Sequence, residues 1–267
     1  MPHHDTRSGK LETYSVWDRT TRVFHWINAT SVFVLAMLGL AILYEDELGF
    51  SSDGIVLLKT VHVYVGYVFV VNLLWRLAWA FVGSEHARWK AILPFHAGFG
   101  AALRHYLRGF ASARPVAYLG HDPLGRLMVT LLLLFLTVQA VTGLVLAGTD
   151  LYKPPLGATM ADWVTGGDVD KLAGLRPGSR EFVDPANYEE MRAFRKPVKN
   201  THLYVFYALL IAIGFHVAGA VIAEIKYRNG LISAMFTGAK VFATSPVDVI
   251  AQDDESHLQN QESEHGS

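Results

Sequence analysis

The sequence contains no cysteine. This absence excludes disulfides, iron–sulfur clusters held by cysteine, thiolate catalysis and covalent attachment of a c-type haem. Charge is also scarce, because Asp, Glu, Lys and Arg make up 18% of the 267 residues, whereas a soluble domain carries roughly a quarter. The formal net charge of −1 provides no basic field that would attract nucleic acid. The composition therefore excludes most soluble proteins and predicts no nucleic-acid partner.

Four long apolar runs account for the missing charge. A helix needs about 20 apolar residues to cross a bilayer, and the runs at 24–44, 55–82, 127–148 and 203–223 are long enough. The polar residues before the first run argue against a cleavable signal peptide. The sequence therefore predicts an all-α integral membrane protein, built as a four-helix transmembrane bundle.

The distribution of Lys and Arg predicts the orientation of this bundle, because short loops rich in these residues stay in the cytoplasm. The segments before the first run and between the second and third runs are basic, whereas the loop after the first run is acidic. We therefore expect both termini to be cytoplasmic and the loops after the first and third runs to be periplasmic. The long loop at 149–201 carries eight basic and eight acidic residues and contributes little to this prediction.

The runs also predict three parts of the chain: a cytoplasmic segment at 1–23, a transmembrane domain at 24–242, and a tail at 243–267. The tail has six acidic residues and no Lys or Arg, which is typical of disorder. An interfacial helix is expected around 97–107. Loops as long as 149–201 are uncommon without a function, and two interpretations stay open: a cap packed on itself, or a docking surface for an external partner.

Histidines inside the apolar runs are the strongest functional signal. Ionisable residues are costly at membrane depth, so His25, His62, His202 and His216 are each candidate functional residues. His202 and His216 are 14 residues apart, which places them on nearly the same helix face and roughly 21 Å apart along the axis. With the predicted orientation, His25 matches the depth of His216 near the cytoplasmic side, and His62 matches His202 near the periplasmic side.

Two facing histidines on neighbouring helices are what the iron of a non-covalent b-type haem requires. Two haem b groups are therefore predicted, with one depth-matched pair of axial ligands each. A single membrane histidine more often bonds a neighbouring helix, and histidines split between two depths cannot form one tetrahedral zinc site. Arg22 and Arg76 lie near the predicted cytoplasmic interface, where they either snorkel or contact haem propionates or a quinone headgroup.

Five sequence features, each occurring once, follow one another along the chain. The first is Arg22-Val-Phe-His25-Trp-Ile, which fits the pattern Arg-x-x-His-Trp. The others are Val61-His-Val-Tyr-Val-Gly-Tyr followed by Gly83-Ser-Glu-His-Ala-Arg, the segment from Ala113 to Arg126, the spacing of His202 and His216, and Thr237-Gly-Ala-Lys240. Together they resemble the cytochrome b subunits of nickel–iron hydrogenases and bacterial cytochrome b561 relatives, over roughly residues 14–148 and 198–242.

This resemblance implies a four-helix bundle with two b haems on His25, His62, His202 and His216. It also implies that an external enzyme passes electrons to the outer haem, and that quinone is reduced near the inner face of a bacterial inner membrane.

The expected partner is a periplasmic hydrogenase acting through its small subunit, but Leu203 stands where hydrogenase cytochromes commonly have a basic residue or histidine. Another periplasmic dehydrogenase or a cytochrome c therefore stays open. So does a stand-alone superoxide:quinone oxidoreductase. A cofactor-free transporter is disfavoured, because the runs lack broken helices and buried acids.

Overall fold

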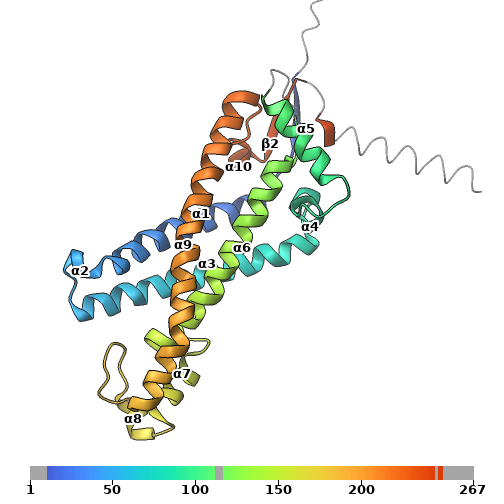
Figure 1. Ribbon diagram of the computed structural model, residues 1–267. Helices are drawn as coiled ribbons and strands as arrows, with labels where there is room; N and C mark the ends of the chain where they lie inside the picture. Colours follow the sequence, from blue (N-terminus) through green and yellow to red (C-terminus); the bar gives the residue numbers. More distant parts are fainter. Residues whose placement is uncertain (1–10, 112–116, 244–245, 249–267) are drawn as a thin grey trace, which may run out of the picture. The chain divides into compact units, whose positions relative to one another are not determined.

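The computed structural model describes residues 11–111, 117–243 and 246–248 (Figure 1). These residues include four helices that are long and apolar enough to cross a membrane: α1 (Arg19–Leu43), α3 (Ser52–Val82), α6 (Pro123–Leu151) and α9 (Pro185–Tyr227). Each contains nearly all of one apolar run, which confirms the four predicted spans.

Large apolar side chains point outward along these helices. Examples are Phe33, Phe81 and Phe215, which are 67%, 73% and 66% exposed. A helix satisfies its own backbone hydrogen bonds, so it can present such side chains to lipid without leaving a polar group unpaired. The chain is therefore a multi-pass membrane protein.

The chain divides into two compact units, and each long helix contributes to both. Unit 1 comprises residues 1–23, 78–131 and 214–267, and unit 2 comprises residues 24–77 and 132–213.

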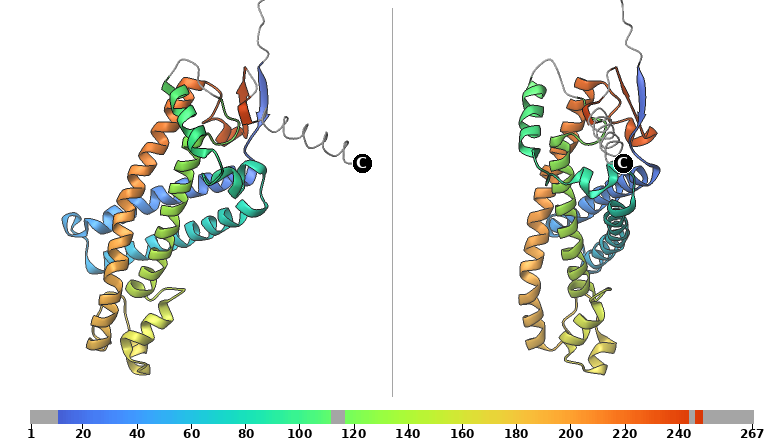
Figure 2. Two further views of the ribbon diagram at one scale, coloured as in Figure 1. Left: turned by 45° about the vertical axis from the view of Figure 1, so that its right-hand side comes forward. Right: turned by 90° about the vertical axis from the view of Figure 1, so that its right-hand side faces the viewer.

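In unit 1, the segment before the first membrane helix pairs with the segment after the last. Strand β1 (Glu12–Ser15) runs antiparallel to β2 (Ala239–Phe242), as Figure 2 shows. A small apolar core lies against this pair and is formed by Val16, Trp17, Leu119, Ala234 and Phe242. The remaining elements of the unit are η1 (Glu85–Ala87), α4 (Trp89–Ile92), α5 (Phe99–Ala111) and α10 (Ala234–Thr237). Helix α5 covers most of the range around 97–107 where a helix was expected, and its location at the membrane interface stays a prediction.

In unit 2, the segment between α6 and α9 folds onto the beginning of α9. It contains α7 (Gly157–Thr165) and α8 (Val169–Gly174), which lie beside the start of α9 in Figure 1. A core of Met160, Val164, Val183 and Met191 joins α7 to the beginning of α9. The connection between α1 and α3 holds one short helix, α2 (Glu45–Leu48). The segment at 149–201 therefore packs on itself, while its use as a docking surface stays a prediction.

Helix α9 begins well before the apolar run that predicted it. The carboxylate of Asp184 accepts hydrogen bonds from the amides of Ala186 and Asn187 at 3.0 and 3.1 Å, and Pro185 takes the first helical position, where its missing amide hydrogen costs nothing. The charged residues that follow are good helix formers. Because hydropathy marks only the membrane part of a helix, it could not reveal this extension. At 43 residues, α9 is about 65 Å long, about twice the hydrocarbon thickness.

The predicted disordered tail lies largely outside the described residues. At its described beginning, the carboxylate of Asp248 accepts hydrogen bonds from the amides of Leu119 and Gly120 at 2.7 and 2.9 Å.

Asp18 begins α1 and joins it to α3 within unit 1. Its carboxylate accepts hydrogen bonds from the amide and the hydroxyl of Thr21 at 2.7 and 2.9 Å, from the Trp79 indole at 3.4 Å, and from the Ser84 hydroxyl. Burial raises the pKa of Asp18, and these hydrogen bonds lower it by more, so the net pKa lies below its usual value.

We predict that Asp18→Ala lowers the free energy of unfolding by about 1–2 kcal/mol, because the cap of α1 is lost. Asp18→Asn should lose less, since asparagine also caps helices. A carboxyl with a lowered folded pKa stabilises above its unfolded pKa and loses this effect as pH falls, so the difference between wild type and Asp18→Asn should shrink below about pH 4. Thermal unfolding in detergent measures this. The exposed Glu47 provides the control, and a Glu47→Ala variant that loses as much would contradict the assignment.

Candidate functional site

Two of the four candidate histidines meet in unit 2. The ring centroids of His62 on α3 and His202 on α9 are 6.4 Å apart, and the ring planes are inclined by 71°. An imidazole nitrogen lies about 2 Å from a bound transition-metal ion, so two rings on opposite sides of one ion have centroids about 6 Å apart. The observed separation therefore fits two axial ligands of one haem iron. Within the described ranges, no group of three or more His, Cys, Asp or Glu could hold a metal ion.

Glycines lie against both rings. A Cβ atom at Gly39 of α1 would lie 3.6 Å from Cε1 of His62, and a Cβ atom at Gly143 of α6 would lie 3.5 Å from Cε1 of His202. One turn after His62, a Cβ atom at Gly66 would have none of the described atoms within 4 Å. The glycines therefore let the backbones of α1 and α6 come into van der Waals contact with these imidazoles, and Gly66 leaves open space among the described atoms one turn after His62.

The two histidines differ in their second ring nitrogen. Nδ1 of His202 lies 2.8 Å from the hydroxyl oxygen of Thr142 on α6. Nδ1 of His62 is buried and has no hydrogen-bond partner in the part of the chain that the structure describes. Sequence reasoning missed Thr142, because a single threonine in an apolar run usually bonds only to its own helix.

The other predicted pair is divided between the two units. His25 belongs to unit 2, where its ring lies edge-on to that of Trp26 at 5.3 Å, and His216 belongs to unit 1. Their pairing therefore stays a prediction.

Both candidate arginines contact protein groups. The guanidinium of Arg22 donates a hydrogen bond to the carbonyl of Phe236 in unit 1. Arg76 is 5% exposed, and its guanidinium carbon lies 5.7 Å from the centre of the Phe24 ring in unit 2. Contacts of either arginine with propionates or quinone stay predictions.

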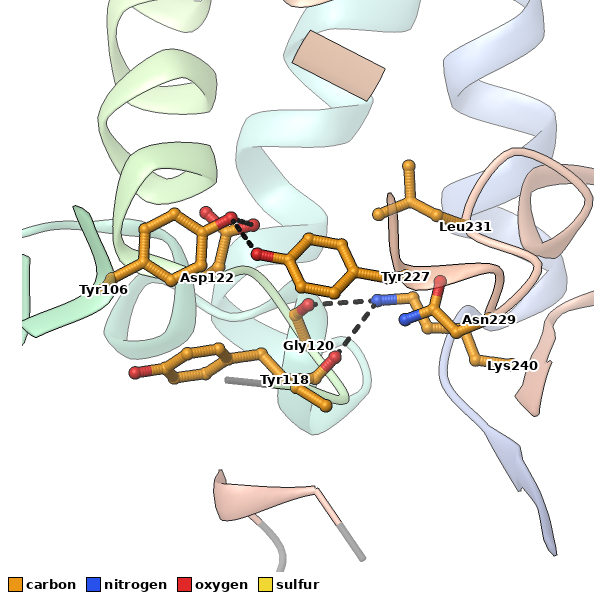
Figure 3. A pocket seen from close by; sticks show the side chains of 9 residues that line it. Tyr106, Tyr118, Gly120, Asp122, Tyr227, Asn229, Leu231 and Lys240 are labelled. Carbon is orange, nitrogen blue, oxygen red and sulfur yellow. Dashed lines mark hydrogen bonds between the residues drawn. The ribbon is translucent and has the colours of Figure 1, made fainter. Parts of the chain in front are cut away.

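A second polar cluster lies in unit 1, around a cavity of about 20 Å³ (Figure 3). Tyr106 of α5 is 2% exposed and donates its hydroxyl hydrogen to Asp122 at 3.0 Å. The hydroxyl of Tyr227 on α9 lies 3.3 Å from that of Tyr106. Sites for small organic ligands usually measure about 300–1,000 Å³, so this cavity is too small for a quinone ring.

Lys240 of β2 borders the same cavity and is 2% exposed. Its ammonium donates to the backbone carbonyls of Leu119 at 2.8 Å, Gly120 at 3.3 Å and Tyr118 at 3.4 Å. Burial lowers the pKa of Lys240 to about 8, although nearby carboxylates, Asp122 foremost, oppose this change. The sequence contained Lys240 only as part of a family motif, and nothing in it indicated burial.

Comparison with known proteins supports the resemblance seen in the sequence. The family described as prokaryotic cytochrome b561 matches residues 16–238. A probable Ni/Fe-hydrogenase B-type cytochrome subunit of Bradyrhizobium diazoefficiens is 29% identical over 243 residues, which cover 86% of this chain and 87% of that protein. Proteins with the same description from Azotobacter vinelandii and Rhodobacter capsulatus are 30% and 28% identical, over 85% and 87% of this chain and 88% and 83% of their own lengths. No solved structure matches.

We predict that Lys240→Met alters how stability depends on pH. The pKa of Lys240 falls from 10.5 to about 8 on folding, so between these values the unfolded state binds more protons than the folded state. The contribution of Lys240 to the free energy of unfolding therefore rises with pH across this window and is smallest below pH 8. Thermal unfolding in detergent from pH 7 to 10.5 should show wild type gaining stability relative to Lys240→Met. Lys90→Met, at an exposed lysine, provides the control. If the stability of wild type and of Lys240→Met changed in parallel with pH, the burial of the Lys240 ammonium would be contradicted.

Proposed function

Because this chain belongs to the prokaryotic cytochrome b561 family, we propose that it carries electrons through two b-type haems, between a periplasmic redox partner and the quinone pool. Membership of this family implies haem b. The observation that supports the proposal most directly is the approach of His62 and His202, whose ring centroids lie 6.4 Å apart on two membrane helices. That separation supports the proposal because two imidazoles on opposite sides of one metal ion have centroids about 6 Å apart.

In this proposal, His62 and His202 hold the outer haem, and His25 and His216 hold the inner one. Helix α9 is continuous from Pro185 to Tyr227, so His202 and His216 lie roughly 21 Å apart along its axis. A hydrocarbon core of about 30 Å then has one ligand near each side. Bound haem supplies a one-electron ferric/ferrous couple, whose potential depends on axial ligands, hydrogen bonds and burial.

The orientation follows from the basic flanks, with both termini in the cytoplasm of a bacterial cell and the membrane being its inner membrane. Electrons then enter at the His62–His202 side and leave near the His25–His216 side. Each quinone takes up two electrons and two protons to form quinol, and the protons come from cytoplasmic water. Arg22 and Arg76 lie toward this side and are candidates to hold an anionic propionate or a quinone oxygen.

The favoured partner is the small subunit of a nickel–iron hydrogenase, because the relatives described above are named as hydrogenase cytochrome subunits. Its docking surface would be the segment at 149–201, which has a packed core of its own. Another periplasmic dehydrogenase or a cytochrome c could use the same surface. A stand-alone superoxide:quinone oxidoreductase is the alternative that needs no docking surface.

The first prediction from this proposal is that the purified chain contains about two b haems. A reduced-minus-oxidised pyridine haemochrome spectrum, divided by polypeptide concentration, measures this number. His25→Ala and His216→Ala should each lose the inner haem and quinone coupling, whereas His62→Ala and His202→Ala should each lose the outer haem and electron entry.

His105→Ala provides a control outside the membrane helices and should keep both haems. Loss of the same single haem from all four variants would contradict the pairing. A folded, haem-supplied preparation without any haem would reject the electron-transfer function itself.

The second prediction concerns the partner. Purification from the native membrane in mild detergent should retain stoichiometric hydrogenase subunits, and hydrogen should then reduce both haems. Retention of a different dehydrogenase would keep the electron-transfer function and replace the partner. Full superoxide-dependent quinone reduction by the isolated chain would instead support the stand-alone oxidoreductase.

A further inference from the structure

The hydroxyl of Thr142 has three polar neighbours within the membrane region of unit 2, of which the carbonyl of Gln139 is the most distant at 3.3 Å. Its side chain is 8% exposed, and Oγ1 lies 2.8 Å from Nδ1 of His202. The same oxygen lies 2.7 Å from the backbone carbonyl oxygen of Val138, four residues earlier on α6. One hydroxyl therefore bridges its own helix and a candidate haem ligand on α9.

The hydrogens available to these atoms determine the tautomer of His202. A threonine hydroxyl has one hydrogen and two lone pairs. When that hydrogen goes to the Val138 carbonyl, as is usual for threonine inside a helix, Oγ1 accepts a hydrogen bond from Nδ1–H of His202. The lone pair of His202 then lies on Nε2 and is free for iron. The opposite arrangement, with the hydroxyl donating to Nδ1, puts the ring hydrogen on Nε2 and blocks ligation there.

The facing histidine has no equivalent support. Nδ1 of His62 is buried without a hydrogen-bond partner among the described residues, although glycines lie beside both rings at similar distances. The site is therefore nearly symmetric in its packing and asymmetric in its hydrogen bonding.

We propose that Thr142 is a positioning residue that fixes the ligating tautomer of His202 and lowers the potential of the haem held by His62 and His202. The inference rests on the proposed function. A hydrogen bond accepted from Nδ1–H makes the opposite ring nitrogen more basic, and a more basic ligand stabilises ferric iron over ferrous iron. Removing the acceptor therefore favours reduction of this haem.

The test is Thr142→Val, which keeps the shape of the side chain and removes the hydroxyl. It is best made in the His25→Ala background, where the outer haem is the one retained. At an ambient potential equal to the midpoint of the parent, the ratio of reduced to oxidised haem should rise about threefold to tenfold, and tenfold corresponds to about 59 mV for one electron. Thr142→Ser restores the acceptor and should return the ratio to that of the parent.

Thr137 provides a matched control on the same helix. Its hydroxyl donates to the carbonyl of Leu133 at 2.7 Å, as that of Thr142 does to Val138. Thr137→Val should leave the potential unchanged, because it removes only a bond within the helix. A purely structural role for Thr142 predicts instead that the two valine variants behave alike.

Unchanged potential in a haem-loaded Thr142→Val variant would overturn the inference. Where Thr142→Val fails to retain haem, Thr142→Cys replaces it, because a thiol fills a similar volume but accepts hydrogen bonds only weakly. A haem potential in the Thr142→Cys variant equal to that in the Thr142→Ser variant would then overturn the inference. Different results reject the proposed function and the role of Thr142. Absence of haem from the wild type rejects the proposed function, whereas an unchanged haem potential in a haem-loaded Thr142→Val variant rejects only the role of Thr142.

Discussion

Hydrocarbon offers no hydrogen bonds, and the structure of this chain depends on that constraint. Its membrane segments are helices, which pair their own backbone groups. Their short polar side chains follow the same rule: the hydroxyls of Ser31, Thr60 and Thr137 each donate to the carbonyl four residues earlier, and the amide of Asn72 donates to the carbonyl of Phe24. Against this background, the buried Nδ1 of His62 is one of the side-chain atoms for which the described residues provide no hydrogen-bond partner.

The same requirement governs the non-helical backbone before α6. Residues 118–120 lie outside the helices and strands, so helical hydrogen bonds do not satisfy their carbonyls and amides. Lys240 donates to all three carbonyls of this segment, and Asp248 accepts from the amides of Leu119 and Gly120. A buried ammonium is costly without hydrogen-bond partners. Here it donates the hydrogen bonds that these carbonyls would accept within a strand or helix.

Hydropathy and histidine spacing predicted the four spans and a candidate site because both depend on local properties of the chain. Composition alone shows that 203–223 must lie in lipid, and helical geometry alone relates His202 to His216. The features that sequence reasoning missed depend on distant partners. The pairing of Glu12 with Phe242, the burial of Lys240 and the contact of Thr142 with His202 each join residues that no periodicity connects. The early start of α9 was missed for a different reason, since charged helix formers outside the membrane resemble a loop in hydropathy.

Helix α9 also relates the proposed docking surface to His202, a candidate haem ligand. Met191 is 1% exposed in the core shared with α7, and Arg195 forms a 2.6 Å ion pair with Asp150 at the end of α6. These contacts hold the extramembrane part of α9 within the same unit as His202. Met191 precedes His202 by 11 residues in the sequence, which is about 16 Å of helix. In the proposed function, a partner docked on the segment at 149–201 would therefore rest on the helix that carries His202, and this helix would set the distance between that partner and the outer haem.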